Sequence, residues 1–356
     1  MSKRSKVFMV VPFKSSFIQG DISIIEKFHP LHLDMHNWAD KKRVPFNMLT
    51  QLFSLLLRIG RTSVIVIEFG GYWSLIPAVM GKIFRVPVII LLHGTDCASL
   101  PNVPYGSLRK RLIKLSCNIS YRCSSLLVPV SESLMYTNNE YCDSFKEQGI
   151  RVHFPHSTTP SEVVFNGLDS GFWKESEERL KERNRCIAVF SENQFKLKGG
   201  DLILSIAEQF PEHNFYIAGT KKPKHLEQIA HNVHFLGKIS REELRDEYRK
   251  ATFHFQLSMF EGFGLALCEA MLCGCVPIGS SVNMIPEIIG DTGFIVDKRD
   301  REILASVLQA ATQESKIEEL GRRARQRIVR EYSLEARENK LNAIINSIQN
   351  ENQKGH

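Results

Sequence analysis

The 356-residue sequence lacks several patterns that would place it in a common class. Its eight cysteines are scattered, with no Cys-x-x-Cys pair and no zinc-ligand spacing, which argues against a secreted disulfide framework and a structural metal site. Cys273 and Cys275 flank Gly274 in an apolar segment and are best interpreted as buried thiols. Zinc-finger and RNA-recognition signatures are absent, so nucleic acid is not an expected partner.

Long apolar runs and targeting segments are also missing. The longest apolar stretches, 52–57 and 86–92, are far shorter than the ~20 residues that span a bilayer. The first six residues lead into a strand-like apolar run without the features of a signal peptide. We therefore expect a cytoplasmic protein, in which the sequon at Asn118 is accidental.

The formal net charge of +7 is unevenly distributed. Residues 1–172 contain 19 Lys and Arg against 12 Asp and Glu, whereas residues 173–356 contain 27 of each kind. The basic residues form no dense tract interleaved with aromatic residues, as a nucleic-acid-binding surface would require. An anionic membrane or a phosphorylated ligand is therefore the favoured partner of the first half.

Short runs rich in Val and Ile alternate with longer segments of helical period, a pattern typical of α/β proteins with buried parallel strands. In the first half, strands are predicted at 7–12, 31–35, 63–69, 86–93 and 125–130, and helices at 18–28, 46–59 and 107–122.

A second α/β series follows the charged stretch 174–185, which we interpret as a solvated linker or surface helix at a domain boundary. Predicted strands are 186–191, 214–219, 233–236, 251–257, 276–279 and 293–296. Predicted helices are 200–210, 241–250, 265–273, 301–311, 315–331 and 334–348. Two Rossmann-like halves are the simplest account of the chain.

The strongest functional signal is the segment 258–274, SMFEGFGLALCEAMLCG, in which a strand ends, a glycine-containing loop follows and an apolar helix begins. Gly262 and Gly264 allow close backbone approach, and the N–H groups at a helix start favour a phosphate. Seven residues separate Glu261 from Glu269, so two carboxylates can face one cleft, near a sugar and near a ribose. The Gly-Phe-Gly sequence alone is equally compatible with a plain turn.

The whole segment resembles the Glu-x7-Glu motif of glycosyltransferase family 4, which comprises retaining sugar-nucleotide transferases with a GT-B fold. Similar stretches are FLGKISREEL at 235–244, EAMLCGCVPIG at 269–279, IPEIIG at 285–290 and TGFIV at 292–296. In the first half, HGTD at 93–96, VPVSES at 128–133 and VFNGLDSGF at 164–172 also fit. The resemblance is specific over roughly 186–300.

This resemblance implies two Rossmann-like domains that face each other across a cleft. Residues 1–172 would bind the acceptor, residues 173–332 would bind the nucleotide sugar, and the helix of 333–356 would pack back on the first domain. The implied reaction moves a sugar, with retention, from a nucleoside-diphosphate sugar to a glycan or lipid-linked acceptor. Neither a cofactor nor a metal is expected, because no Asp-x-Asp motif is present.

The site residues are carried over by matching position. Glu261, His93 and Lys198 would be catalytic, with Glu261 in a positioning and electrostatic role, because a nucleophilic role needs a distance that sequence does not give. Glu269 would bind the ribose hydroxyls, and the backbone around it would contact sugar and phosphates. The remaining expected donor-binding residues are Lys196, Lys238, Ile239, Gly262, Phe263, Gly264, Leu265, Ala266 and Gly20.

Two positions depart from the family pattern. Relatives of this kind carry an arginine five or six residues before the lysine that Lys198 matches, but Glu192 and Asn193 occupy that region here. Lys196 is either the second charge or a solvated loop lysine, and a lysine lacks the bidentate fork of arginine. In the first loop only Gly20 stands where paired glycines are usual, so this loop serves either the donor or the acceptor side.

An amphipathic helix is predicted at 108–122, with Leu108, Leu112, Leu115 and Ile119 at helical spacing beside five basic residues. One interpretation is a core-facing helix with a solvated basic face. The other is an interfacial surface that holds the protein against anionic lipid, extended by the basic residues 41–43.

Other functions are compatible with parts of the sequence. The missing arginine is compatible with a protein that binds nucleotide sugars without turnover. A sugar-nucleotide epimerase or a phosphorylase of the same fold is a second alternative, which the paired glutamates disfavour. A dehydrogenase is least expected, because no Gly-x-Gly-x-x-Gly follows the first strand.

Overall fold

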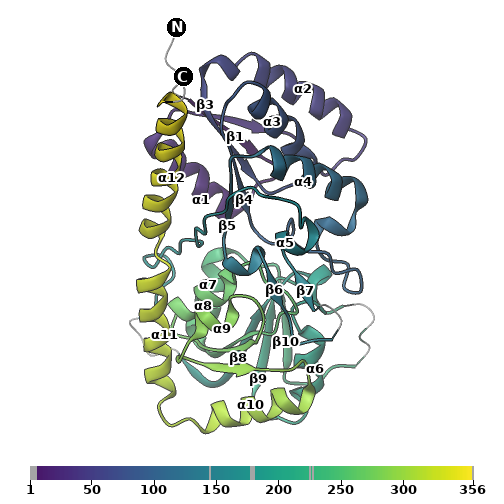
Figure 1. Ribbon diagram of the computed structural model, residues 1–356. Helices are drawn as coiled ribbons and strands as arrows, with labels where there is room; N and C mark the ends of the chain where they lie inside the picture. Colours follow the sequence, from purple (N-terminus) through teal and green to yellow (C-terminus); the bar gives the residue numbers. More distant parts are fainter. Residues whose placement is uncertain (1–5, 144–145, 177–180, 224–225, 227, 355–356) are drawn as a thin grey trace. The chain divides into compact units, whose positions relative to one another are not determined.

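The computed structural model describes residues 6–143, 146–176, 181–223, 226 and 228–354. They form two compact units (Figure 1). Unit 1 comprises 1–137, 147–166 and 335–356, and unit 2 comprises 138–146 and 167–334. The predicted first domain, 1–172, differs from unit 1 at 138–146 and 167–172, which belong to unit 2. Asn139 donates to the carbonyl of Met259 (2.7 Å) and Lys298 donates to the carbonyl of Glu140 (2.7 Å), which ties the segment 138–146 to unit 2.

Unit 1 contains a five-stranded parallel sheet in the order β2-β1-β3-β4-β5. The five predicted strands are confirmed to within two residues. Their bounds are Lys6–Val11 for β1, Leu31–Met35 for β2, Thr62–Glu68 for β3, Val88–Leu92 for β4 and Leu126–Pro129 for β5. Strands β3 and β4 are buried along their whole length, as expected of a sheet covered on both faces.

The helices of unit 1 include one that the sequence pattern missed. Helix α3 spans Tyr72–Ile83 and contains Pro77, a residue that is unfavourable inside a helix. The others are α1 (Ser16–Phe28), α2 (Val44–Leu56), α4 (Arg111–Cys123) and α5 (Ile150–His153), with 3-10 turns at 59–61, 107–109 and 132–134. A short two-stranded sheet pairs β6 (Thr137–Asn138) with β7 (Glu147–Gln148).

Unit 2 contains a six-stranded parallel sheet in the order β10-β9-β8-β11-β12-β13. The strands are β8 (Glu182–Val189), β9 (Asn214–Ala218), β10 (Val233–Gly237), β11 (Ala251–Gln256), β12 (Val276–Ser280) and β13 (Phe294–Val296). The helices are α6 (Gly200–Ala207), α7 (Arg241–Lys250), α8 (Leu265–Leu272), α9 (Ile285–Ile289), α10 (Arg301–Gln313) and α11 (Ile317–Glu331), preceded by the 3-10 turn 192–194. Strand β8 begins inside the stretch predicted as a linker, of which residues 177–180 lie outside the described residues.

The last helix, α12, spans Leu334–Lys354 and packs on unit 1 from Glu335 onward. Its Leu341, Ile344 and Ile345 join the core formed by β1, β3, β4 and α1. Burial of these side chains against a core made from the other end of the chain provides the hydrophobic free energy that holds the helix. In the described part of the chain, none of the helices is both long enough and apolar enough to cross a bilayer.

Helix α4 does not bury the side chains that its sequence pattern selects. Leu112 and Leu115 are 68% and 55% exposed, and the buried face is instead Ile113, Ser116, Cys117, Ser120 and Tyr121. These mostly small residues allow close packing against α3. The prediction that the leucine stripe faces the core is therefore wrong for Leu112 and Leu115.

Candidate functional site

Glu261 is the centre of a polar cluster in unit 2. One of its carboxylate oxygens, Oε2, accepts hydrogen bonds from Gln256 Nε2 (2.6 Å) and Ser258 Oγ (3.0 Å). The same oxygen forms an ion pair with Lys198 Nζ. The side chains of Lys198 and Glu261 remain 15% and 13% exposed. The pair is thus fixed by neighbours and still accessible to a ligand.

The strand β11 and the residues after it supply most of this cluster. Because side chains alternate along a strand, His254, Gln256 and Ser258 project to one side. His254 Nε2 donates to Gln256 Oε1 (3.2 Å), which fixes the Gln256 amide. Burial lowers the pKa of His254 to about 4, so this ring is neutral at physiological pH. This period-two polar run lies at the end of a predicted strand, but its residues were not among those predicted for the site.

Lys198 reaches Glu261 because a glycine follows it. Gly199 adopts a left-handed conformation (φ +77°), and a Cβ there would lie 2.5 Å from Leu257 Cβ and 2.8 Å from Leu257 O. Only glycine permits this close approach of the turn to the end of β11. The turn is also fixed by a hydrogen bond from Met259 N to Leu197 O (2.8 Å).

The loop after Glu261 leads directly into the N-terminus of α8. Gly264, the N-cap residue, has a φ of +116°, and no side chain caps the helix. The first N–H groups of α8, at Leu265 and Ala266, have no intrahelical acceptor and point along the positive end of the helix dipole. Phe263 is buried against the ring of Tyr332 (5.4 Å), so this residue offers a ligand its backbone rather than its ring.

Glu269 lies one turn further along α8. Burial raises the pKa of its carboxyl group to about 8, and the nearby charge of Arg241 opposes this shift. A protonated or weakly ionised carboxyl group can exchange hydrogen bonds with hydroxyl groups at little desolvation cost. These properties suit the ribose-binding role expected of Glu269.

The remaining residues predicted for the donor lie on the loops around this cluster. Lys196 is exposed in the turn before α6, and its carbonyl accepts from Arg299 (3.4 Å). Lys238 and Ile239 follow β10, immediately before the capping box of Ser240 and Glu243 that starts α7. Lys196 and Lys238 are thus solvated lysines at loop positions.

The first candidate residue of unit 1, His93, is buried at the end of β4. Its Nε2 lies 2.7 Å from Glu68 Oε2, and its ring packs on Phe69, with 4.4 Å between ring centroids. Burial lowers the pKa of His93 to about 4 and raises the pKa of Glu68 well above its usual range. The two side chains therefore form a neutral pair, and Nδ1 is the ring nitrogen that this pair does not use.

Asp96, the last residue of the predicted HGTD motif, fixes the backbone around His93. Its Oδ1 accepts from the N–H groups of His93 (3.2 Å) and Gly94 (3.0 Å), and its Oδ2 accepts from Gly70 N (3.0 Å). Both Glu68 and Asp96 were missed as site residues, because the sequence does not show that β3 and β4 are neighbours.

A buried ion pair lies behind His93. Arg337 of α12 forms two hydrogen bonds of 2.6 Å with the two carboxylate oxygens of Asp21, and it also donates to the carbonyls of Val164 (3.0 Å) and Phe165 (2.8 Å). Asp21, Glu68 and His93 place ligand atoms within 4.8 Å of one another, a spacing suited to a metal. Arg337 already engages both oxygens of Asp21, so the donor set does not fit a cation there.

The structure corrects the prediction for Gly20. Helix α1 begins at Ser16 with Ser15 as its N-cap, so Gly20 lies in the second turn of a helix and not in a loop. Its N–H group falls beyond the four that a helix start leaves free, and a Cβ at this position would meet open space. The position therefore does not favour a backbone contact with the donor.

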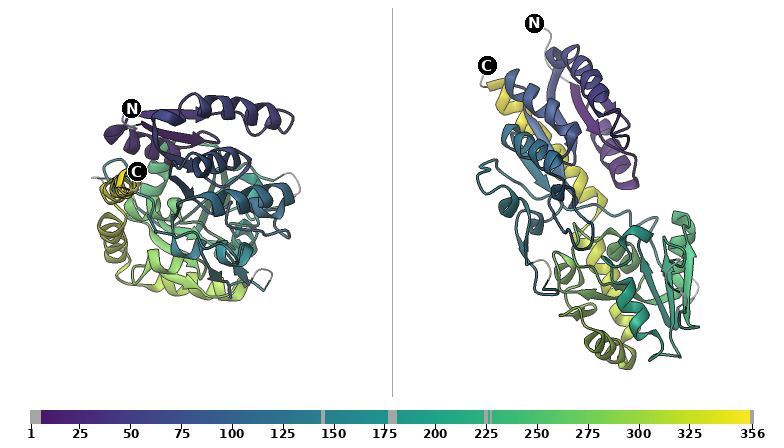
Figure 2. Two further views of the ribbon diagram at one scale, coloured as in Figure 1. Left: turned by 45° about the horizontal axis from the view of Figure 1, so that its top comes forward. Right: turned by 90° about the vertical axis from the view of Figure 1, so that its right-hand side faces the viewer.

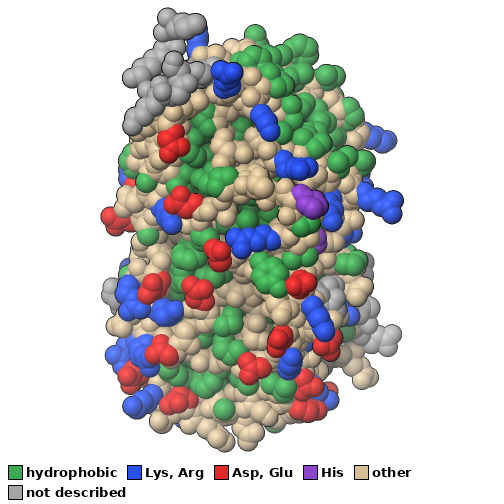
Figure 3. Space-filling view, in the orientation of Figure 1, with side chains coloured by type: hydrophobic (Ala, Val, Ile, Leu, Met, Phe, Trp, Pro, Cys, Tyr) green, Lys and Arg blue, Asp and Glu red, His purple; other side chains and the backbone are tan. Residues whose placement is uncertain are grey.

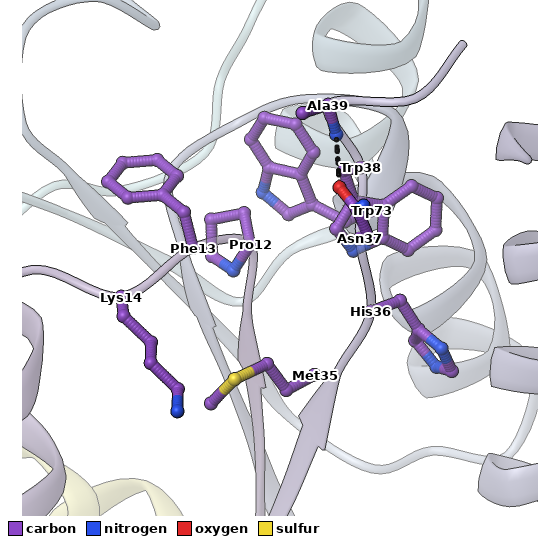
Figure 4. Close-up of a pocket in the computed structure, with 9 residues that line it drawn as sticks. All are labelled: Pro12, Phe13, Lys14, Met35, His36, Asn37, Trp38, Ala39 and Trp73. Atoms are coloured by element: carbon purple, nitrogen blue, oxygen red, sulfur yellow. Dashed lines mark hydrogen bonds between the residues drawn. The ribbon is translucent and has the colours of Figure 1, made fainter.

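Unit 1 contains a pocket of about 530 Å³ at the carboxyl ends of β1 and β2 (Figure 4). Its aromatic residues are Phe13, Trp38 and Trp73, with 6.2 Å between the ring centroids of the two tryptophans. Trp38 is only 7% exposed, and its Nε1 has no hydrogen-bond partner among the described residues. The remaining lining residues are Pro12, Lys14, Met35, His36, Asn37 and Ala39.

The family-model match lies in unit 2. Residues 171–327 match the family model "Glycosyl transferases group 1". The chain is 37% identical to O-antigen chain mannosyltransferase B of Escherichia coli over 84 residues, 23% of this chain and 22% of that protein. It is 26% identical to N-acetyl-alpha-D-glucosaminyl L-malate synthase of Bacillus anthracis over 270 residues, 70% of this chain and 65% of that protein. The match thus spans less than two thirds of either relative.

Solved structures match nearly the whole chain. Sucrose-phosphate synthase of Thermosynechococcus elongatus superimposes with a TM-score of 0.75 at 14% identity, covering 97% of this chain and 99% of that one. Anabaena HepE in complex with UDP and glucose gives 0.71 at 15% identity, covering 96% and 100%. At such identities the likeness establishes the fold. The fold is GT-B, and its second unit carries the similarity to glycosyl transferases of group 1.

Proposed function

We propose that this protein is a retaining glycosyltransferase of family 4, which moves a sugar from a nucleoside-diphosphate sugar to a glycan or lipid-linked acceptor without a metal or other cofactor. The observation that carries the proposal is the Lys198–Glu261 pair beside the open N-terminus of α8, with Glu269 one turn along the same helix. The relatives named above, a mannosyltransferase and a glucosaminyl malate synthase, support the same reaction class.

The leaving nucleoside diphosphate is the group that this site stabilises. Negative charge develops on the diphosphate as the glycosidic bond breaks, and fixed donors aimed at that charge lower the barrier. The uncapped N–H groups of α8 and the ammonium group of Lys198 are such donors. When the diphosphate binds, Lys198 exchanges part of its contact with Glu261 for the phosphate oxygens.

Glu261 acts in this proposal by position and charge. Its Oε2 is engaged by Lys198, Gln256 and Ser258, which stabilise the carboxylate and lower its nucleophilicity. A carboxylate held in this way suits the stabilisation of positive charge at the anomeric carbon better than attack on it. Retention would then follow from reaction at one face, with the leaving phosphate accepting the proton of the acceptor hydroxyl.

The pocket of unit 1 is the acceptor site in this proposal. Aromatic faces suit the apolar faces of a sugar ring, and the buried indole N–H of Trp38 needs an acceptor such as a sugar oxygen. The proposal also includes a cytoplasmic location, at the inner face of the membrane. The surplus of basic residues in the first half of the chain supports this location.

The deciding experiment incubates the protein with sugar nucleotides of different bases and with glycan and lipid-linked acceptors, in the presence and absence of EDTA. We expect transfer to one donor and acceptor pair, an unchanged anomeric configuration in the product and full activity with EDTA. Thermal stabilisation by a sugar nucleotide without any transfer would instead identify a nucleotide-sugar-binding protein. Formation of an epimerised sugar nucleotide would identify an epimerase.

A further inference from the structure

Helix α2 differs from a normal surface helix in which side chains it buries: polar side chains lie on its buried face and large apolar ones on its exposed face. Its buried side chains include Asn47 and Gln51, whose amide groups donate to Asn37 O (2.9 Å) and to Asp34 Oδ2 (2.8 Å). Leu55 is buried as well, but the other large apolar side chains of this region point outward: Phe46 is 66% exposed, Leu49 55%, Phe53 63%, Leu56 42% and the following Leu57 82%. Exposing five large apolar side chains to water is unfavourable unless another apolar phase covers them.

Exposed apolar side chains also occur on the neighbouring helices α3 and α4. Helix α3 packs against both α2 and α4, and the exposed apolar residues Ile83 and Phe84 at its end and Leu112 and Leu115 on α4 add to the surface. Figure 3 shows hydrophobic side chains gathered over the region where Figure 1 draws α2, and Figure 2 shows α2 at the outer edge of unit 1 in both views. We call these nine residues of α2, α3 and α4 the apolar face of unit 1.

Basic residues predominate around the apolar face, where Asp40, directly before Lys41, pairs with Arg43 (3.3 Å). Between Lys41 and Ser131 the sequence contains twelve Lys and Arg residues, all exposed or half-buried. The only acidic residues in this segment are Glu68 and Asp96, both fully buried. Helices α2, α3 and α4 therefore present no carboxylate to solvent, and Lys41, Lys42 and Arg43 directly precede the apolar residues of α2.

We propose that the apolar face of unit 1 docks onto an anionic lipid bilayer. Apolar side chains of an interfacial helix enter the boundary between headgroups and acyl chains, while lysine and arginine remain at the level of the anionic headgroups. The inward hydrogen bonds of Asn47 and Gln51 hold α2 with its apolar side outward. A second copy of the chain is a poorer occupant, because pairing two such faces brings like charges together.

This inference rests on the surface itself and does not require the proposed transfer reaction. It does give the reaction a place to occur, because Asn47 links α2 to Asn37 in the aromatic pocket. A lipid-linked acceptor in the bilayer would then lie near the pocket that is proposed to receive it.

The first test measures binding of the full chain to vesicles of phosphatidylcholine with and without phosphatidylglycerol, by co-sedimentation. We expect binding to the anionic vesicles at low salt, weakened at least tenfold at about 0.5 M salt, where charges are screened within a few ångströms. The F53S/L57S variant should bind at least tenfold more weakly, because two exposed apolar anchors are lost. The matched control I303S/V329S removes exposed apolar residues of unit 2 and should bind like the wild type.

The second test separates charge from apolar insertion. K41E/K42E should weaken binding to anionic vesicles at least tenfold, since each basic residue near such a surface contributes roughly fivefold. The control K316E/R322E changes two exposed charges of unit 2 and should have little effect. Because all these side chains are exposed, thermal unfolding of each variant should match the wild type.

The third test inserts a probe at the most exposed position. L57W should show a blue-shifted emission with anionic vesicles and quenching by brominated acyl chains. Absence of quenching, or equal vesicle binding by wild type and F53S/L57S, would overturn the proposal. So would a dimer that F53S/L57S converts to a monomer without any effect on vesicle binding, which would make the face a contact between copies. Transfer activity without vesicle binding would overturn only this inference and not the proposed function.

Discussion

Each unit contains a polar cluster that includes an ion pair between a basic and an acidic side chain, and the two clusters differ in burial. In unit 1, Arg337 and Asp21 are 4% and 2% exposed, and His93 and Glu68 are 5% and 0% exposed. In unit 2, Lys198 and Glu261 are 15% and 13% exposed. Arg337 has its remaining donors fixed by backbone carbonyls, whereas Lys198 is a point charge on a flexible stem. The buried cluster of unit 1 therefore keeps its partners, whereas Lys198 in unit 2 can exchange its contact with Glu261 for a ligand.

The difference in burial determines whether a cluster contributes mainly to the stability of the fold or mainly to ligand binding and catalysis. A fully buried ion pair recovers its desolvation cost only while both partners are present, so removing one leaves an uncompensated charge. In the partly exposed pair of Lys198 and Glu261, water can replace a partner that is removed. We therefore expect changes in unit 1 to act mainly on stability and changes in unit 2 to act mainly on catalysis and nucleotide binding.

Arg337→Met should have the largest effect. The substitution leaves Asp21 buried without its cation, beside a protonated Glu68, and should lower the free energy of unfolding by about 3–5 kcal/mol. Urea denaturation measures this loss. The matched control Lys27→Ala breaks the surface pair between Lys27 and Glu338 of the same helix and should cost less than about 1 kcal/mol. Equal losses for the two variants would show that the buried cluster is no more important than a surface pair.

Lys198→Ala should lower turnover about 10²- to 10³-fold and weaken nucleotide binding, because a fixed cation that stabilises the leaving diphosphate is lost. Steady-state kinetics and calorimetric titration with the nucleotide measure the two effects. Lys196→Ala is the control two residues away in the same turn, and it should change both quantities little if Lys196 is a solvated loop lysine. Unchanged kinetics in Lys198→Ala and Glu261→Ala would contradict the assignment of the site to unit 2.

Glu261→Gln should lower turnover about 10- to 100-fold while leaving nucleotide affinity equal or higher. The amide oxygen still accepts hydrogen bonds from Gln256 and Ser258, but the negative charge is lost and Lys198 is freed for the diphosphate. The same kinetic and calorimetric measurements apply. A large loss of affinity would show that Glu261 binds the nucleotide directly and does not act at the sugar.

Glu269→Gln should change the pH dependence of stability. Because burial raises the pKa of Glu269 to about 8 in the folded protein, the wild type should lose stability as the pH rises from about 4.5 to about 8. The variant lacks this loss, so from this cause its stability should equal that of the wild type at pH 4 and exceed it by about 4 kcal/mol at pH 8. Denaturation at both pH values measures the difference, and a gap that does not grow with pH would contradict a raised pKa.

Much of the donor half was predictable from the chain alone, for a local reason. Glu261, the glycine turn and α8 follow one another within a dozen residues, so their chemistry can be recognised without knowing the fold. Gln256 and Ser258 were equally local but were missed, because polar residues at a strand end are common. The assignment of Gly20 to a loop failed because Gly20 lies inside α1, and the predicted helix at 18–28 already contained this position.

The unit 1 cluster was not predictable from spacing. Asp21, Glu68 and Arg337 come from an early helix, a central strand and the last helix, and 316 positions separate Asp21 from Arg337. The aromatic pocket likewise combines residues from the ends of β1 and β2 with Trp73 of α3. Such contacts depend on strand order and on the return of the last helix, which hydrophobic periodicity does not encode.

The sequence by itself determined the alternation of strands and helices, the glycine-containing turn before α8 and the concentration of positive charge in the first half, because each is a property of neighbouring residues. Only the tertiary structure decided which faces of α2 and α4 are covered. Leu112 and Leu115 of α4 looked like part of a core stripe, yet mostly small residues on the other face pack against α3, and in α2 the polar Asn47 and Gln51 are buried beside Leu55. Burial is a relation between elements, and periodicity within one helix identifies its apolar face without showing what that face will meet.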